Sequence, residues 1–159
     1  MSSHIIVDLD NCIADDAWRI PMIRWNETDL MERYHVYHTA AAFDSLANVD
    51  IISQMATPII FTARPEKYRP ITEQWLARNS VPYAHLVMRP DDDHTPSTEL
   101  KRRMLQSLPE STGIPWQWIV AAYDDRPDVV EMYRRHYIDA HVRAIHNVCA
   151  YTKPTQEPQ

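Results

Sequence analysis

Residues 5–10 read Ile-Ile-Val-Asp-Leu-Asp, an apolar run that ends in two carboxylates. A short apolar run of this kind is typical of a strand that is buried on both faces, as in a parallel sheet. Two further runs share the layout: residues 59–64 read Ile-Ile-Phe-Thr-Ala-Arg, and residues 119–126 read Ile-Val-Ala-Ala-Tyr-Asp-Asp-Arg. Ligands of open parallel sheets bind beyond the carboxyl ends of the strands. The three runs therefore predict a site where carboxylates, a hydroxyl and arginines meet at one edge of a sheet.

The side chains at these strand ends suit phosphoryl transfer through an aspartate. Asp8 comes first after its apolar run. It is the predicted nucleophile, because a carboxylate that attacks phosphorus divides one difficult hydrolysis into two easier steps. Strand side chains alternate between faces, so Asp10 is expected to point to the same side as Asp8. From there Asp10 can protonate the leaving alkoxide and later accept a proton from the attacking water.

A phosphate dianion would be repelled by these two carboxylates, which predicts a cation at the same place. Mg²⁺ is a hard ion that takes oxygen ligands and usually keeps several waters. Its predicted ligands are Asp8 and Asp10, with a further anchor from Asp124 or Asp125, so that all four carboxylates are candidates.

Two more residues are predicted to act on the phosphate group. Thr62 can donate a hydrogen bond to a phosphoryl oxygen, and Lys101, which opens the stretch Lys-Arg-Arg-Met-Leu, can neutralise charge that develops there. Each has an ordinary explanation when it is taken alone, since Thr62 could cap a helix and a single lysine is usually a surface residue. Their occurrence together with the carboxylates favours an active site.

The four elements resemble the motifs of the haloacid dehalogenase (HAD) superfamily of phosphohydrolases. Asp8 with Asp10, Thr62, Lys101, and the pair at residues 124–125 stand at the four motif positions. Within this superfamily the sequence is most similar to the 3′-phosphatase domain of phage-type polynucleotide kinases. Thr62-Ala63-Arg64 is similar to the Ser-Gly-Arg of those domains, and residues 124–135, Asp-Asp-Arg-Pro-Asp-Val-Val-Glu-Met-Tyr-Arg-Arg, resemble their Asp-Asp-Arg…Val-Val-Glu-Met stretch.

The expected fold class is α/β, a three-layer Rossmann-like HAD fold with a mostly parallel sheet and a small helical cap. We expect one domain over residues 1–159, a cap insertion around 14–47, and a flexible tail at 153–159. The first strand should be central, with the second and the fourth beside it. Strands are expected at residues 4–10, 58–61, 85–88, 118–123 and 142–145. Helices are expected at residues 45–56, at 70–79, from residue 97 or 98 through Lys101, and at 127–136, with a turn at 107–115.

Five residues are candidates for contact with the substrate. Arg64 and Arg126 follow strand ends and could pair with phosphates. Trp18 and Arg19 lie in the expected cap, where they could stack on a base and hold a phosphate, although packing is the more common role of such a tryptophan. Asn11 is the fifth, and it stands where the superfamily usually has glycine. Asparagine tolerates a left-handed backbone, so the turn after Asp10 should be kept.

Composition limits the kind of partner. The net charge is −6, so the chain lacks the basic surface with which proteins hold long nucleic acid. A phosphorylated nucleotide, or the end of a nucleic-acid strand, is the expected substrate. No stretch approaches ~18 consecutive apolar residues, and no membrane span is predicted. Two cysteines make no disulfide framework, so a reducing cytoplasm is the expected location.

The predicted function is that of a Mg²⁺-dependent phosphomonoesterase that acts through an aspartyl-phosphate intermediate. The resemblance implies that it removes 3′-phosphates from nucleic-acid ends or nucleotides. A 5′-deoxyribonucleotidase would suit the acidic composition equally well, and a non-catalytic subunit of a repair complex is a third alternative. The complete motif set favours an enzyme, because a pure binding protein would not need it.

Overall fold

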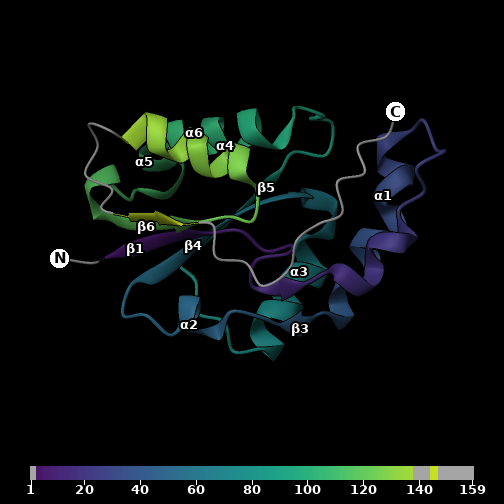
Figure 1. Cartoon of the computed structure of the whole chain (residues 1–159), viewed down its shortest axis with the longest axis horizontal. Helices are drawn as coiled ribbons and strands as arrows, with labels where there is room; N and C mark the ends of the chain where they lie inside the picture. Colours follow the sequence, from purple (N-terminus) through teal and green to yellow (C-terminus); the bar gives the residue numbers. More distant parts are fainter. Residues whose placement is uncertain (1–2, 138–143, 147–159) are drawn as a thin grey trace.

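The computed structural model describes residues 3–137 and 144–146, and a parallel sheet forms the centre of this part (Figure 1). Its strands stand in the order β5-β4-β1-β6-β7, and every neighbouring pair is parallel. The first strand is therefore central, with the predicted second and fourth strands beside it. The strands are β1 (His4–Val7), β4 (Thr57–Pro65), β5 (His85–Arg89), β6 (Ile119–Tyr123) and β7 (Ala144–His146).

Helices cover both faces of the sheet, which makes three layers (Figure 1). On one face lie α2 (Val49–Ile52) and α3 (Arg69–Arg78), and on the other lie α4 (Ser97–Gln106), α5 (Leu108–Thr112) and α6 (Pro127–Tyr137). Strand β1 supplies both cores, because its side chains alternate: Val7 packs in the cluster that contains Trp75, and Ile6 packs in the one that contains Val129. Full burial of such side chains contributes about 1.5–3 kcal/mol each. The predicted α/β class is confirmed.

The segment between β1 and β4 forms a small irregular unit in the region predicted as a cap. It contains a two-stranded antiparallel sheet of β2 (Ala14–Asp15) and β3 (Ser45–Leu46). Between these strands lie η1 (Ala17–Met22), α1 (Leu30–Thr39) and η2 (Ala40–Phe43). Asp29 caps the N-terminus of α1: its side chain accepts hydrogen bonds from two backbone N–H groups of the first turn. In Figure 1 this helix stands beyond the sheet, on the side to which the chain runs from β1.

Two sequence predictions of secondary structure are wrong. The helix predicted at 45–56 is reduced to α2, because residues 45–46 pair with β2 and Asn48 has a left-handed backbone with φ 48°. The turn predicted at 107–115 contains α5, with a proline in its first turn and a left-handed Gly113 after its end. Two short 3₁₀ helices, η3 (Glu66–Tyr68) and η4 (Trp116–Trp118), precede α3 and β6. Residues 142–143 of the predicted fifth strand and the predicted tail at 153–159 lie outside the described residues.

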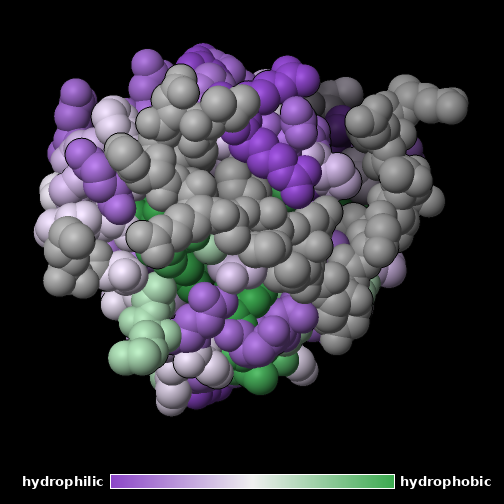
Figure 2. Space-filling model, turned by 60° about the vertical axis from the view of Figure 1, so that its left-hand side comes forward, coloured by the Kyte–Doolittle hydropathy of each residue, from purple (hydrophilic) through white to green (hydrophobic). Residues whose placement is uncertain are grey.

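The surface of the described part is of mixed hydropathy. Among the coloured residues of Figure 2, hydrophilic side chains lie beside hydrophobic ones. Phe43 and Met55 are the most exposed large apolar side chains. Among residues 3–137 and 144–146, no helix has both the length and the apolar character needed to cross a membrane.

Candidate active site

The predicted motif residues meet where the central strands end. Asp8 directly follows β1, and its backbone N–H donates to the carbonyl of Tyr123 at 3.0 Å. This bond holds the first motif beside the end of β6, where Asp124 and Asp125 follow. Thr62 lies in β4 at a point where the pairing with β5 becomes irregular. The sheet thus delivers three motifs to one edge, as the sequence predicted.

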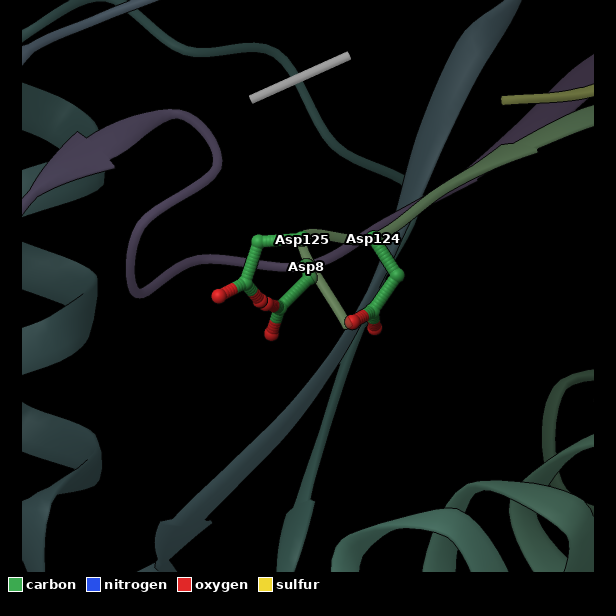
Figure 3. Close-up of side chains that lie close together, drawn as sticks. All are labelled: Asp8, Asp124 and Asp125. Atoms are coloured by element: carbon green, nitrogen blue, oxygen red, sulfur yellow. The ribbon is translucent and has the colours of Figure 1, made fainter. Parts of the chain in front are cut away.

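Three carboxylates form an acidic cluster at this edge: Asp8, Asp124 and Asp125 (Figure 3). One oxygen of each lies within 4.8 Å of the others. Asp8 and Asp124 are buried, whereas Asp125 is partly exposed. Close carboxylates without a cation repel one another, and oxygen donors of this kind are what Mg²⁺ prefers. The donor set of the cluster therefore fits a hard divalent cation.

Lys101 comes to the same place from α4. Its Nζ lies 2.9 Å from Asp8 Oδ1 and donates a 2.5 Å hydrogen bond to Asp124 Oδ2. Burial alone would lower the pKa of Lys101, but the charges of Asp124 and Asp8 outweigh burial and raise this pKa well above its usual value. A buried ammonium group beside the predicted nucleophile can neutralise negative charge on a phosphoryl oxygen.

Asp124 has a raised pKa of about 6. Burial is the main cause, the neighbouring charge of Asp8 adds to it, and Lys101 opposes both. The backbone N–H of Arg126 also donates to Asp124 Oδ1, at 3.0 Å. A cation in the acidic cluster would favour the charged form of this carboxylate.

Asn11 connects the loop after β1 with the acidic cluster. Its backbone is left-handed, with φ 57°, which confirms that asparagine supports the turn at a position where the superfamily usually has glycine. Its Nδ2 donates to Asp125 Oδ2 at 2.9 Å. This contact orients a carboxylate of the cluster, whereas the sequence predicted that Asn11 would contact substrate.

Asp10 is not a member of the acidic cluster, and its carboxylate is bound by two buried arginines. Its Oδ1 accepts hydrogen bonds from Nη2 of Arg19 at 2.5 Å and from Nη2 of Arg64 at 2.7 Å. Its Oδ2 accepts from Nε of Arg64 at 3.2 Å. Among the described residues, the group that could hold a metal ion does not include Asp10. The cluster therefore gives no support to the metal-ligand role that was also predicted for Asp10.

The two arginines were predicted to contact substrate, but the structure buries both of them. The side chains of Arg19 and Arg64 are both 0% exposed. Nη1 of Arg64 donates to Thr72 at 3.1 Å, and Nη1 of Arg19 donates to the carbonyl of Tyr37 at 3.0 Å. Arg19 and Arg64 are therefore buried partners of Asp10, without access to a substrate from solvent.

Asp44 is a buried member of this network that sequence reasoning missed. It follows η2 and accepts two hydrogen bonds from Arg19, Nε to Oδ1 at 2.8 Å and Nη2 to Oδ2 at 2.7 Å. Burial alone would lower the pKa of Arg19, but the charge of Asp10 and the hydrogen bond to Asp44 raise it. No motif or periodicity marks Asp44, which lies in the segment expected to be a cap, directly before the expected helix at 45–56.

Thr62 keeps its predicted place at the edge of the sheet. It is buried, and its Oγ1 accepts the backbone N–H of Arg64 at 3.1 Å. A hydroxyl that accepts one bond still has its own hydrogen to donate. Thr62 can therefore serve a phosphoryl oxygen while it shapes the turn in β4.

The other two predicted substrate residues lie nearer to solvent. Trp18 is 44% exposed, and its indole Nε1 donates to Asp44 at 2.9 Å, which partly supports the packing interpretation. Arg126 follows the acidic cluster, and its guanidinium donates to Asp128 from Nε at 3.0 Å and from Nη2 at 2.8 Å. With 47% of its side chain exposed, Arg126 is better placed than Arg19 or Arg64 to meet a phosphate from solvent.

Comparison with known proteins gives one family and a group of similar folds. The family model of the polynucleotide kinase PNKP phosphatase domain matches residues 2–143. A search of curated protein sequences gives no significant match.

Several solved structures have the same architecture, among them chains of RNA repair complexes and a HAD-superfamily hydrolase. A chain in the Pnkp1/Rnl/Hen1 RNA repair complex has 23% identity and a TM-score of 0.65, over 95% of this chain and 44% of that one. A chain of a second Pnkp1/Rnl/Hen1 complex has 22% identity and a TM-score of 0.61, over 91% and 45%. A HAD-superfamily hydrolase of subfamily IA from Geobacter sulfurreducens has 11% identity and a TM-score of 0.52, over 91% of both chains. These likenesses confirm the predicted HAD fold, and the chain spans less than half the length of the first two.

Proposed function

The chain belongs to the family of polynucleotide kinase PNKP phosphatase domains, and on this premise we propose that it is a Mg²⁺-dependent phosphomonoesterase that removes 3′-phosphates from nucleic-acid ends or nucleotides. The observation that carries the proposal is the position of Asp8, which lies 2.9 Å from Lys101 and within the acidic cluster. In this position Asp8 lies beside a lysine that can neutralise charge and beside two carboxylates that could bind a cation with it.

Each residue has a defined step. An oxygen of Asp8 attacks phosphorus, so that a carboxylate–phosphorus bond forms while the ester P–O bond breaks. Asp10 donates a proton to the leaving alkoxide, and then accepts a proton from the water that attacks the aspartyl-phosphate. Lys101 and Thr62 stabilise the phosphoryl oxygens as charge develops on them.

The acidic cluster is proposed to hold Mg²⁺, with oxygens of Asp8, Asp124 and Asp125 as ligands. When bound, the ion supplies neutralisation of phosphate charge at this edge of the sheet. Asn11 would keep Asp125 in position through the Nδ2–Oδ2 hydrogen bond, and Lys101 would keep Asp124 in position.

Metal binding should appear in stability, and it should depend on pH. A ligand that binds only the folded state at a hundredfold excess over its Kd stabilises by about 2.7 kcal/mol, which raises Tm by roughly 5–10 °C for a chain of this size. The folded-state pKa of Asp124 is raised to about 6, so the protonated form of this carboxyl group is favoured by folding. The stability that this preference gives the apo protein is lost as pH rises through about 6. We therefore expect Mg²⁺ to raise Tm more at pH 7.5 than at pH 5, where the ion must displace a proton.

Thermal denaturation with Mg²⁺ and with a chelator at the two pH values measures this effect. Asp124→Asn should abolish most of the response, while Asp50→Asn, at an exposed carboxylate on α2, should keep it. An equal rise in Tm for wild type and Asp124→Asn would show that the ion binds elsewhere.

Substrate choice is tested by two esters measured side by side. We expect a higher kcat/KM on a 3′-phosphorylated oligonucleotide than on a 5′-mononucleotide, with little gain beyond about four nucleotides and only a gentle fall with salt, because few counterions are released. Arg126→Ala should raise KM for the 3′-phosphate substrate more than for an aryl phosphate, since we propose that this half-exposed guanidinium pairs with a second phosphate.

The matched control is Arg135→Ala, which removes an exposed arginine of α6 that pairs with Glu131. It should leave both KM values near those of wild type. A clear preference for the 5′-mononucleotide would instead identify a nucleotidase. The absence of turnover on every ester would favour a non-catalytic subunit.

A further inference from the structure

Asp44 is held from both sides at the junction of the cap and the core. Its backbone carbonyl accepts a hydrogen bond from the indole Nε1 of Trp75, a buried residue of α3, at 2.9 Å. Its side chain accepts from Trp18 and from Arg19, both of η1. Both carboxylate oxygens of Asp44 are thus occupied, and its position is fixed by the core.

Asp44 in turn fixes the guanidinium of Arg19. Arg19 Nε and Nη2 donate to the two oxygens of Asp44, and Nη1 donates to the carbonyl of Tyr37. The ring of the same tyrosine lies 4.1 Å from the guanidinium carbon. A planar guanidinium bound along one edge and packed on a ring has little freedom to turn.

The contact that remains is directed at Asp10. Nη2 of Arg19 carries two hydrogens, so it can donate to Asp44 and, at the same time, to Asp10 Oδ1. Arg64 also binds Asp10, from Nη2 to the same Oδ1 and from Nε to Oδ2, and its Nη2 lies 3.9 Å from Asp44 Oδ2. The two carboxylates and the two arginines balance in charge, which buried ions require.

We propose that Asp44 is a positioning residue for the acid–base step: it orients Arg19, which holds the Asp10 carboxyl group against the leaving group. This inference rests on the proposed function, because only a hydrolysed ester reports the position of Asp10. Asp44 lies in the segment between β1 and β4, and Asp10 lies in the loop directly after β1. Because Arg19 joins the two carboxylates, proton transfer by Asp10 would depend on the position of that segment.

The test compares two leaving groups in one protein preparation. An alkyl phosphate needs protonation of its leaving oxygen, whereas an aryl phosphate with an acidic phenol needs little. A displacement of about 1 Å can cost ~10²-fold in rate, so Asp44→Asn should lower kcat for the alkyl ester roughly 10- to 100-fold more than for the aryl ester. KM should change little for either. Any loss of folded protein cancels in the ratio.

The matched control is Leu108→Ala, which creates a packing defect in the core cluster on the opposite face of the sheet without altering a charge or a hydrogen bond of Asp44. It should lower stability while leaving the alkyl-to-aryl ratio near that of wild type. A second variant, Arg19→Lys, keeps the charge but cannot form the fork of bonds. It should reproduce the selective loss on the alkyl ester, and it serves alone if Asp44→Asn does not fold.

The outcomes separate the two proposals. If wild type hydrolyses both esters and the ratio in Asp44→Asn or Arg19→Lys stays within about twofold of wild type, Asp44 is only structural and the inference is overturned. If wild type hydrolyses neither ester, the proposed function fails and the inference fails with it. A selective loss that does not increase further when the two substitutions are combined would support the path from Asp44 through Arg19 to Asp10.

Discussion

Substitution of Asp8 by asparagine is expected to reduce phosphatase turnover to background while the fold survives. The side chain keeps its shape but loses the charge that attacks phosphorus. Enzymes accelerate phosphate-monoester hydrolysis by up to ~10²¹-fold, so uncatalysed hydrolysis could not conceal the loss. Lys101 would still pair with Asp124, so we expect the far-UV CD spectrum to be unchanged. The measurement is steady-state turnover of a phosphate ester in Mg²⁺.

A second substitution separates charge from position. Asp8→Glu restores the carboxylate but moves it by one methylene, and a misplacement near 1 Å can cost ~10²-fold. It should therefore remain far below wild type. The matched control is Asp50→Asn, at an exposed aspartate outside the site, which should be fully active. If purified Asp8→Asn kept a tenth of wild-type activity, Asp8 would not be the nucleophile.

The strand-end motifs could be predicted because two simple rules apply to them. Apolar runs of three to five residues indicate buried parallel strands, and polar residues that follow such runs gather at one edge of the sheet. These rules bring Asp8 next to residues 124–125 without any knowledge of the contacts. Lys101 needed the resemblance, because it lies on a helix whose sequence is that of an ordinary amphipathic surface segment.

The segment between β1 and β4 could not be predicted in the same detail. Its contacts join irregular segments far apart in sequence, such as Arg19 with Asp44 and Asn48 Nδ2 with the carbonyl of Cys12. No periodicity marks such pairs. An arginine beside a phosphate site was expected to bind phosphate, but Arg19 and Arg64 both lie buried against Asp10. The sequence identifies a charge without identifying the partner that will bury it.

The helix predicted at 45–56 illustrates a different limit. Its composition permits a helix, but local preference gives way to tertiary structure: β3 pairs with β2, and Ala47 N–H donates to the carbonyl of Ile13 at 2.8 Å. These bonds hold residues 45–47 extended beside the first motif. As a result Asp44 lies next to Arg19, a contact that a regular helix from residue 45 would not require.

Asp10→Asn should slow the hydrolysis of the two esters unequally, and the difference should be larger than for any substitution of Asp44. Asparagine leaves the nucleophile in place but cannot give a proton to an alkoxide. General acid catalysis is typically worth ~10²–10⁴-fold, so we expect a loss of this size in kcat on a sugar phosphate and a much smaller loss on an aryl phosphate. The measurement is kcat and KM for both esters with one preparation of the variant.

Stability must be separated from chemistry in this experiment. Asp10→Asn leaves Arg19 and Arg64 with Asp44 as their shared carboxylate, and breaking a buried pair from one side costs about 3–5 kcal/mol. A lower Tm is therefore expected, and only the ratio of the two losses is diagnostic, because both substrates report the same folded fraction. Leu108→Ala supplies a destabilised reference in which the charges and the hydrogen bonds of Asp44 are intact. Equal losses on both esters in Asp10→Asn would show that Asp10 holds the arginines in place but does not transfer the proton.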